Sequence, residues 1–398
     1  MKRFNRGVWL CASAAALMSN SLSAAPVKIQ NEEQAASTWM LVNTFTHSIE
    51  NEVMRGPDIV LQKVLRSMQD LDRVTTPQRL LASKQGVSIP CEFGGSFTAR
   101  MTRARPGELT IDWSACTQEA DEYSNSILSG PVTMKLTTNS FTPECIESLR
   151  AGTKTANVIW TTNYTDPESP QVSEEEFNFT MRGAIPVTRL FEYGYFTGEG
   201  NFTLSGSWIG SSQSLLDGYS DRSSTIVQGA RVKRSNIYSD NNTVLSRSFE
   251  LVKGSLVSRA ESPYGAREHS FTAKNFRARE FTDFNDLITV MQQQWIDGKV
   301  NYQYGEGFNP VCVSGDYVLK TRVPMTNLSL FTKQDRDEGE VVINNATVRF
   351  YPAANVPPYL PAPIGSMLTT IDVKNVGLFA FDSDYRSPRT VAAVSQCW

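Results

Sequence analysis

Acidic side chains are the residues of this sequence that come closest to a catalytic pattern. Glu174, Glu175 and Glu176 form a run before an expected strand, and Asp382 and Asp384 lie two residues apart in an expected loop. Two carboxyl groups about 5 to 9 Å apart could hydrolyse a glycosidic bond between them. Charge runs at strand edges are more often solvated. A secreted hydrolase with a carboxylate-based site is therefore kept as an alternative prediction.

Histidine and cysteine patterns give no stronger indication of chemistry. Only two histidines occur, His47 and His269, so a histidine-rich metal site is excluded. No Gly-x-Ser-x-Gly motif accompanies His269, and no histidine lies near Cys145 in the sequence to activate its thiol as a nucleophile. The sequence thus predicts no catalytic residue, no metal ion and no cofactor, and it favours a protein that is not an enzyme.

Aromatic residues beside turns are the candidate ligand contacts. Tyr193, Tyr195 and Phe196 cluster before one glycine turn, and Tyr302 and Tyr304 precede another. Most aromatic residues at alternate strand positions belong to the core. Those beside turns are the ones that could form a platform for a sugar or a peptide.

The N-terminus has the form of a secretory signal peptide. In residues 1–25, basic side chains precede an apolar run, and small residues follow it. The run is too short to span a membrane as a stable helix, and no later segment is apolar enough to do so. We therefore expect an exported protein, periplasmic or secreted, with no integral transmembrane helix after signal cleavage.

Export changes how the cysteines are interpreted. In an oxidising compartment, sparse cysteines usually form structural disulfides. Five cysteines follow the signal peptide, so at least one has no partner within the chain. We predict the structural disulfides Cys91–Cys116 and Cys312–Cys397, which leaves Cys145 over.

The segment between Cys91 and Cys116 has the pattern of a β-hairpin. Apolar and polar residues alternate on both sides of a turn expected at Arg105-Pro106-Gly107. Cys91 falls in the apolar register and Cys116 in the polar one. A bulge at Gly94-Gly95 would reverse the phase of the first strand and bring the two sulfurs together. Such a disulfide closes a loop of about 25 residues and contributes about 3 kcal/mol.

Periodicity divides the chain into four parts. They are the signal peptide (1–25), an N-terminal helical region (26–88), a main antiparallel β domain (89–280), and a helix with a second, smaller β unit (281–398). In the helical region, apolar residues at spacings of three and four predict a pair of helices that is broken at Gly56-Pro57.

The same spacing predicts one internal amphipathic helix at residues 282–297. Most other segments alternate with period two, and Asn344-Asn345 is a good two-residue hairpin turn. The predicted fold class is mainly β: an antiparallel β-sandwich or strongly curved sheet, with the N-terminal helical pair and the one internal helix.

Composition narrows the function without defining it. The 398 residues carry a net charge of −3 and are 20% charged, an ordinary globular balance that does not indicate nucleic-acid binding. The leading prediction is an exported non-enzymatic protein with a binding or structural role in the envelope, whose partner is an unknown ligand or envelope protein. Besides the hydrolase, an outer-membrane β-barrel is the other alternative, because a wet lumen would give the same alternation.

Overall fold

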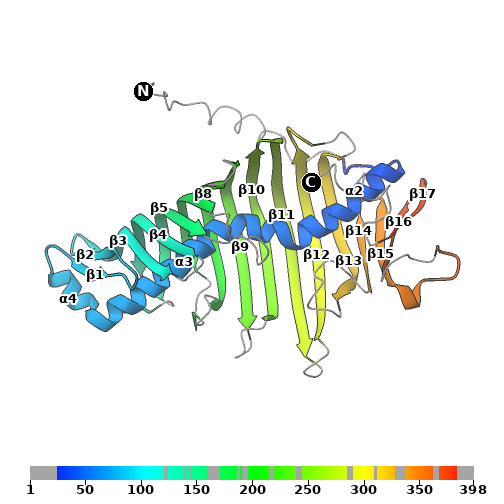
Figure 1. Cartoon of the computed structure of the whole chain (residues 1–398). Coiled ribbons are helices and arrows are strands. Elements are labelled where there is room, and N and C mark those ends of the chain that lie inside the picture. Colours follow the sequence, from blue (N-terminus) through cyan, green and yellow to red (C-terminus); the bar gives the residue numbers. More distant parts are fainter. Residues whose placement is uncertain are drawn as a thin grey trace.

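One long antiparallel sheet wraps around an N-terminal helical rod (Figure 1). The computed structural model describes residues 25–382 apart from 121–123, 139, 143–144, 160–170, 186–188, 191–195, 215–218, 239–243, 285–289, 309–311, 328–337 and 362–366. The helical segments are α2 (Glu32–Asn43), the π-helix η1 (Thr44–Ser48), α3 (Ile49–Val74), α4 (Pro77–Ala82) and the short 3-10 helix η3 (Ala353–Asn355). Within the described residues, no helix is both long enough and apolar enough to cross a membrane.

The strands follow one another as a meander. They are β1 (Val87–Pro90), β2 (Ser96–Thr102), β3 (Arg105–Ala120), β4 (Ser124–Leu136), β5 (Ile146–Ile159), β6 (Gln171–Ala184), β7 (Arg189–Leu190), β8 (Phe196–Ser214), β9 (Ser220–Tyr238), β10 (Val244–Ser262), β11 (Gly265–Phe284), β12 (Val290–Tyr304), β13 (Gly315–Asn327), β14 (Glu338–Ile343), β15 (Ala346–Pro352), β16 (Met367–Val373) and β17 (Gly377–Asp382). Each long strand pairs antiparallel with its neighbours in the chain, and the short β7 pairs only with β8.

The prediction of a mainly antiparallel, strongly curved sheet is confirmed. Among the described strands, β1 and β17 do not pair with each other, so the sheet is open. Pairing is continuous from β11 through β12 to β13, and the domain boundary expected at residue 280 lies inside β11. The hairpin predicted at Asn344-Asn345 joins β14 to β15, with Asn344 at a φ of +54°.

The internal helix predicted at 282–297 is wrong. Residues 290–304 form β12, which is hydrogen-bonded to β11 on one side and to β13 on the other, and residues 285–289 lie outside the described part of the chain. Gln294, Ile296 and Val300 are buried, while Trp295 and Lys299 are not. A short series of apolar residues is compatible with both the helical period of about 3.6 residues and the strand period of two. Here the strand forms because it can hydrogen-bond to both β11 and β13.

The helix break expected at Gly56-Pro57 is also absent, because α3 continues through Pro57. Proline removes one backbone hydrogen bond, at a cost of about 3 kcal/mol within a helix. Buried contacts on both sides, at Val53, Val60 and Val64, offset that loss. Together α2, η1 and α3 form an unbroken rod from residue 32 to residue 74.

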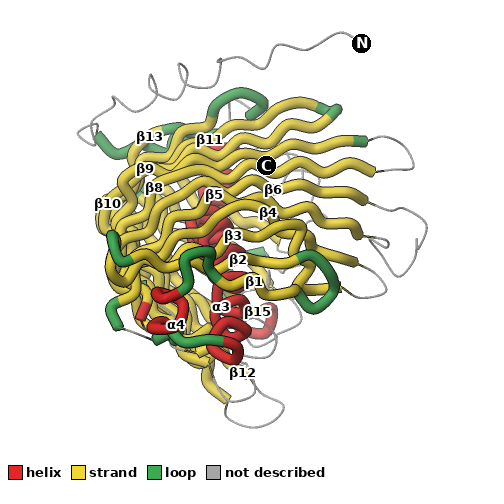
Figure 2. The backbone as a smooth tube through the Cα atoms, turned by 90° about the vertical axis from the view of Figure 1, so that its left-hand side faces the viewer, coloured by secondary structure: helices red, strands yellow, loops and turns green. Residues whose placement is uncertain are grey.

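The core lies between this rod and the concave face of the sheet. Phe45 stands at its centre, with its ring centroid about 6 Å from those of Phe271, Phe276, Tyr302 and Tyr317. Figure 2 shows the strands bending around the helices. The bend needs irregular backbone, which β-bulges supply.

Bulges occur at neighbouring positions of successive strands. Residues with positive φ lie beside register shifts in β8, β9, β10, β11 and β12: Gly206, Gly229, Gly254, Asn275 and Gly298. Because they line up across the sheet, the bends add up to one crease. The crease curves the sheet around the helical rod.

Candidate functional site

A cleft on the concave face, called the polar cleft below, is the strongest candidate for a binding site. Its volume is about 740 Å³, and it is lined by Arg55 of α3 and by the ends of β5, β6, β8, β9, β10 and β11. This volume falls within the range of about 300 to 1,000 Å³ that is usual for ligand sites. Arg55 is the residue of the rod that lines the cleft.

Cross-strand register builds the floor of the polar cleft from small residues. Glu175, Gly210, Ser223, Ala260 and Arg267 lie directly opposite one another on five successive strands. The three central residues have short side chains, and the two end residues are charged. The surface is therefore hollow in the middle and charged at the ends.

A second row adds hydrogen-bonding groups. It contains Asn157, Ser173, Ser212 and Asp221, again on adjacent strands. Residues that face the same side of a strand recur with period two, so this row lies on the same face as the first. Hydroxyl, amide and carboxylate groups together present both donors and acceptors to a ligand.

Charges of both signs surround the cleft. Arg55 forms an ion pair with Glu175, which ties α3 to β6. The guanidinium of Arg267 lies 5.9 Å from the ring centroid of Phe308, and Nε of Arg259 forms an ion pair with the Glu261 carboxylate at 2.8 Å. With balanced charges, the cleft suits a polar ligand without a large net charge.

A pair of tyrosines lies at the rim. Tyr264, at the β10–β11 turn, is 89% exposed and lines the cleft. Its ring centroid is 5.8 Å from that of Tyr219. The Tyr219 hydroxyl donates a hydrogen bond to Asp221, and this bond raises the pKa of Tyr219. The rim therefore offers aromatic faces beside polar groups.

The structure separates the acidic residues that the sequence placed together. Glu175 faces the polar cleft, whereas Glu176 points to the opposite face, where its carboxylate lies 3.1 Å from Lys154. Asp382 ends β17, far along the sheet, and Asp384 lies outside the described residues. Of the described members of these two acidic patterns, only Glu175 lines the polar cleft.

The aromatic candidates are also redistributed. Tyr302 is buried in the core, and burial raises the pKa of both Tyr302 and Tyr304, which pack against each other. Tyr193 and Tyr195 lie outside the described residues. Sequence reasoning missed Tyr264, although the turn Pro263-Tyr264-Gly265 between two polar strands was a signal that could have found it.

The disulfide predicted between Cys91 and Cys116 is present, with the two Cα atoms 5.5 Å apart. The irregularity that brings the two sulfurs together is not the expected bulge at Gly94-Gly95 in the first strand. Cys91 lies in the turn between β1 and β2, and the phase change comes instead from Ala115 in β3, whose φ is +48°. The β2–β3 reversal falls at residues 103–104, just before the expected turn.

The other cysteines are only partly described. Cys145 is a buried free thiol, as the predicted pairing left it. Cys312 is buried, and its expected partner Cys397 lies outside the described residues, so this pairing stays a prediction.

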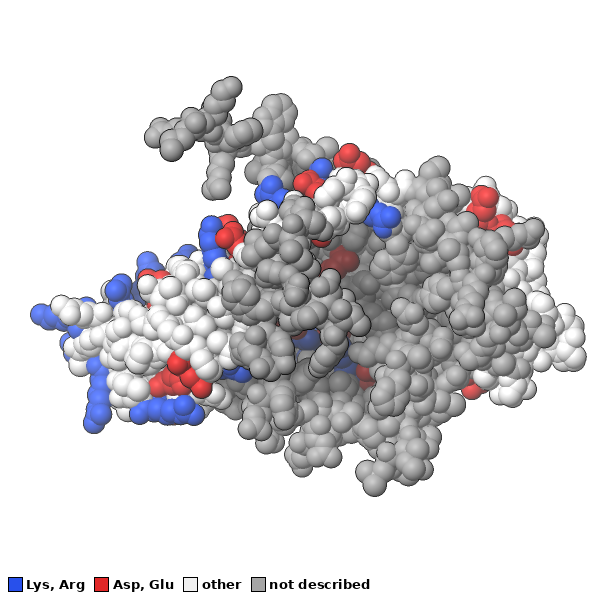
Figure 3. Space-filling view, in the orientation of Figure 1, with Lys and Arg blue, Asp and Glu red and all other residues white. Residues whose placement is uncertain are grey.

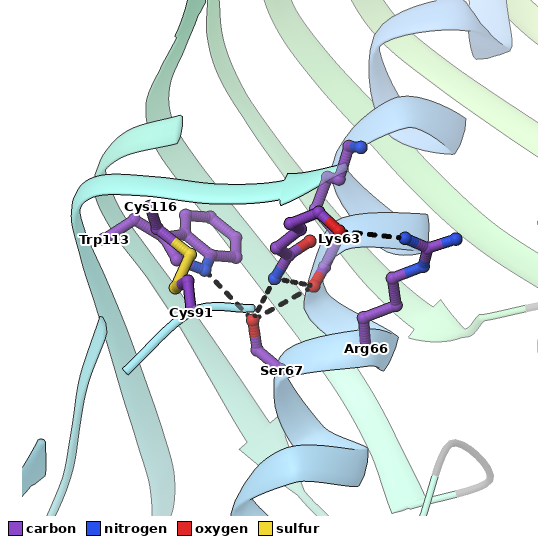
Figure 4. Close-up of a disulfide and its surroundings, with 7 residues drawn as sticks. Lys63, Arg66, Ser67, Cys91, Trp113 and Cys116 are labelled. Atoms are coloured by element: carbon purple, nitrogen blue, oxygen red, sulfur yellow. Dashed lines mark hydrogen bonds between the residues drawn. A yellow bond between two sulfur atoms is a disulfide. The ribbon is translucent and has the colours of Figure 1, made fainter. Parts of the chain in front are cut away.

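Polar contacts join the disulfide region to the helical rod (Figure 4). The indole N–H of Trp113 donates to the Ser67 hydroxyl at 3.0 Å, and the side-chain amide of Gln118 donates to the same oxygen at 2.8 Å. Arg66 reaches the Gln118 carbonyl at 3.4 Å. All of these groups anchor α3, so this cluster is structural.

The geometry therefore defines a disulfide-stabilised antiparallel β protein with an open polar cleft. Comparison with known protein families, curated proteins and solved structures finds no match. The function must be argued from the site itself.

Proposed function

We propose that this protein is an exported, non-enzymatic binding protein that holds a hydroxyl-rich ligand, of the oligosaccharide class, in the polar cleft. The observation that carries the proposal is the composition of the cleft: small residues on the floor, a second row with hydroxyl, amide and carboxylate groups beside it, and an exposed tyrosine at the rim. Sugar hydroxyls both donate and accept hydrogen bonds, as serine and asparagine side chains do. The apolar faces of sugar rings suit an aromatic platform.

Binding is favoured over hydrolysis by the state of the acidic groups. The Glu175 carboxylate is already ion-paired with Arg55, and the Asp221 carboxylate accepts a hydrogen bond from Tyr219. A glycosidase needs one carboxyl group free to reach the leaving oxygen and another at the sugar carbon. These contacts make Glu175 and Asp221 ligand-positioning groups instead.

The binding proposal is tested by calorimetric titration of the purified full chain with a panel of neutral oligosaccharides. One ring contact is worth about 1 kcal/mol, so Tyr264→Ala should weaken binding about fivefold. Ser212→Phe should abolish binding, because a large side chain in the second row would fill part of the cleft. Tyr359→Ala is the matched control, because Tyr359 is 78% exposed and is not part of the cleft lining.

Two results would contradict the binding proposal. One is that no oligosaccharide of the panel binds to the wild-type chain. The other is that the Tyr264 and Tyr359 variants lose affinity equally. Release of shorter sugars during the titration would favour the hydrolase alternative.

Export is tested separately by cell fractionation and non-reducing peptide mapping. The full chain should appear in a periplasmic or secreted pool with Cys91 and Cys116 linked. A chain that lacks residues 1–25 should stay in the cytoplasm with free thiols, because cytoplasmic reductants keep cysteines reduced. Cytoplasmic retention of the full chain would disprove export.

A further inference from the structure

Four cations lie directly opposite one another on four successive strands. Arg231 pairs with Lys253, Lys253 with Lys274, and Lys274 with Lys299. All four side chains are exposed. Neighbouring strands lie about 4.8 Å apart, so this cationic row spans about 14 Å.

The row lies on the convex face. Val232, Ala273 and Val300 are next to row members in the chain, and they are buried in the core on the side of the helical rod. Successive side chains alternate across a strand, so the row points away from the rod. The polar cleft is on the opposite face of the sheet.

No carboxylate of the described residues forms an ion pair with any of the four cations. In the neighbouring row, by contrast, the cations are paired with a carboxylate: Glu250 lies 3.4 Å from Lys233 and 3.1 Å from Arg277. Like charges directly opposite each other on adjacent strands destabilise a sheet. The cationic row therefore opposes folding, and an external anion would relieve that repulsion.

The shape of the sheet determines which anion fits. The row crosses the strands beside the crease formed by Gly229, Gly254, Asn275 and Gly298, where the outer surface bends. A plane touches such a convex surface along a line that crosses the strands, which is the direction of the row. A flat anionic surface can therefore touch all four cations at once.

Exposed apolar residues accompany the cations on this face. Val318 lies opposite Lys299 and is 37% exposed. Further along the strands, Ile237 and Phe281 are both aligned with Ser246, and they are 47% and 45% exposed. Cations with apolar side chains between them are typical of surfaces that bind lipid head groups and insert into the interface.

We propose that the convex face docks on a membrane surface that carries anionic lipids, with Arg231, Lys253, Lys274 and Lys299 against the head-group phosphates. This orientation turns the concave face, with its polar cleft, away from the membrane. The docking surface shares no residue with the cleft, so it stands independently of the proposed function.

The test is co-sedimentation of the purified full chain with vesicles of phosphatidylcholine, alone or mixed with phosphatidylglycerol. Wild type should bind the anionic vesicles and lose affinity as salt is added. Each cation near an anionic surface contributes about 1 kcal/mol, which is roughly fivefold in partitioning. Replacing all four row residues with glutamine should therefore weaken partitioning by several hundredfold.

A matched control removes four other exposed cations: Arg79, Lys84, Arg100 and Arg103. They belong to the end of the molecule formed by α4, β1 and β2, where Lys and Arg gather in Figure 3. This variant should keep binding within a few-fold of wild type. Because the row variant removes repulsion, it should melt no lower than wild type.

Three results would overturn the proposal. The row variant could bind as wild type does, the control could lose as much as the row variant, or wild type could bind a DNA duplex and not the anionic vesicles. If the fourfold variant fails to fold, Lys274→Gln alone should still weaken partitioning about fivefold. Unchanged binding by that single variant would also contradict the proposal.

Discussion

Buried charges on α3 are matched by charges on the sheet. The Glu50 carboxylate is 7% exposed and lies 2.9 Å from Arg234 and 3.0 Å from Arg247. Arg234 also reaches Asp58 at 2.7 Å. Such pairs add little net stability, because desolvation opposes the attraction, but a mispaired rod would leave charges buried alone. These residues therefore fix how the rod sits against β9 and β10.

A residue-scale prediction concerns Glu340 on β14. Burial acts to raise the pKa of Glu340, but hydrogen bonds from Arg349 at 2.7 Å and Arg322 at 3.0 Å outweigh it, so this pKa is lowered. A carboxyl with a lowered pKa stabilises the fold above its ordinary pKa and loses that effect as pH falls. Glu340→Gln should cost about 1 kcal/mol at neutral pH.

Urea denaturation across pH checks the Glu340 prediction. The difference between wild type and variant should shrink as pH falls through the lowered pKa. Glu338→Gln, at an exposed position of the same strand, should change stability little at any pH. A Glu340 difference that persists in acid would contradict the electrostatic explanation.

At the scale of elements, close packing explains why α3 crosses the sheet without interruption. Gly56 faces Trp208 of β8, and a Cβ at this position would lie 2.8 Å from the indole ring. Trp208 is 5% exposed, so it has little room to move. A glycine at the crossing lets the helix approach the sheet closely.

Gly56→Ala should therefore destabilise the protein, although alanine favours helix by about 1 kcal/mol over glycine. Overpacking typically costs about 1 to 3 kcal/mol, which exceeds this gain or cancels it. Chemical denaturation of Gly56→Ala, Trp208→Leu and the double variant gives the coupling between the two sites. We expect Gly56→Ala to cost less in the Trp208→Leu background. A single Gly56→Ala variant more stable than wild type would contradict the close approach.

At the scale of the whole molecule, aligned bulges create the curvature on which both proposed surfaces depend. At Gly298, φ is +126°, and a Cβ would meet the Asn275 backbone oxygen at 2.3 Å. The hairpin glycine Gly265 has a similar φ of +138°, but a Cβ there would meet no atom within 4 Å. Comparing alanine variants at these two glycines therefore separates the cost of the unusual φ from the cost of the close contact between strands.

Alanine at either glycine should destabilise, because side chains rarely adopt such φ values. Gly298→Ala should cost about 2 kcal/mol more than Gly265→Ala, since it also forces two strands of the crease apart. Thermal and urea unfolding of both variants measure the difference. Equal losses would mean that the crease tolerates a wider strand separation.

Local pattern was enough to predict most of the strands, the helical N-terminal region and the Cys91–Cys116 disulfide. The alternation of apolar and polar residues indicates which face of a strand is buried, and this pattern can be read from residues that are close together in the sequence. The predicted helix at 282–297 failed because its short apolar stripe fits two periods, and strand pairing decided between them.

The polar cleft and the cationic row could not be predicted in this way. Arg55 and Glu175 are 120 residues apart, and the row joins residues from four strands whose register depends on bulges. One inserted residue changes which side chains stand opposite each other. The sequence by itself determined that these residues are polar and exposed, whereas the tertiary structure decided which of them meet, because register and curvature are properties of the whole sheet.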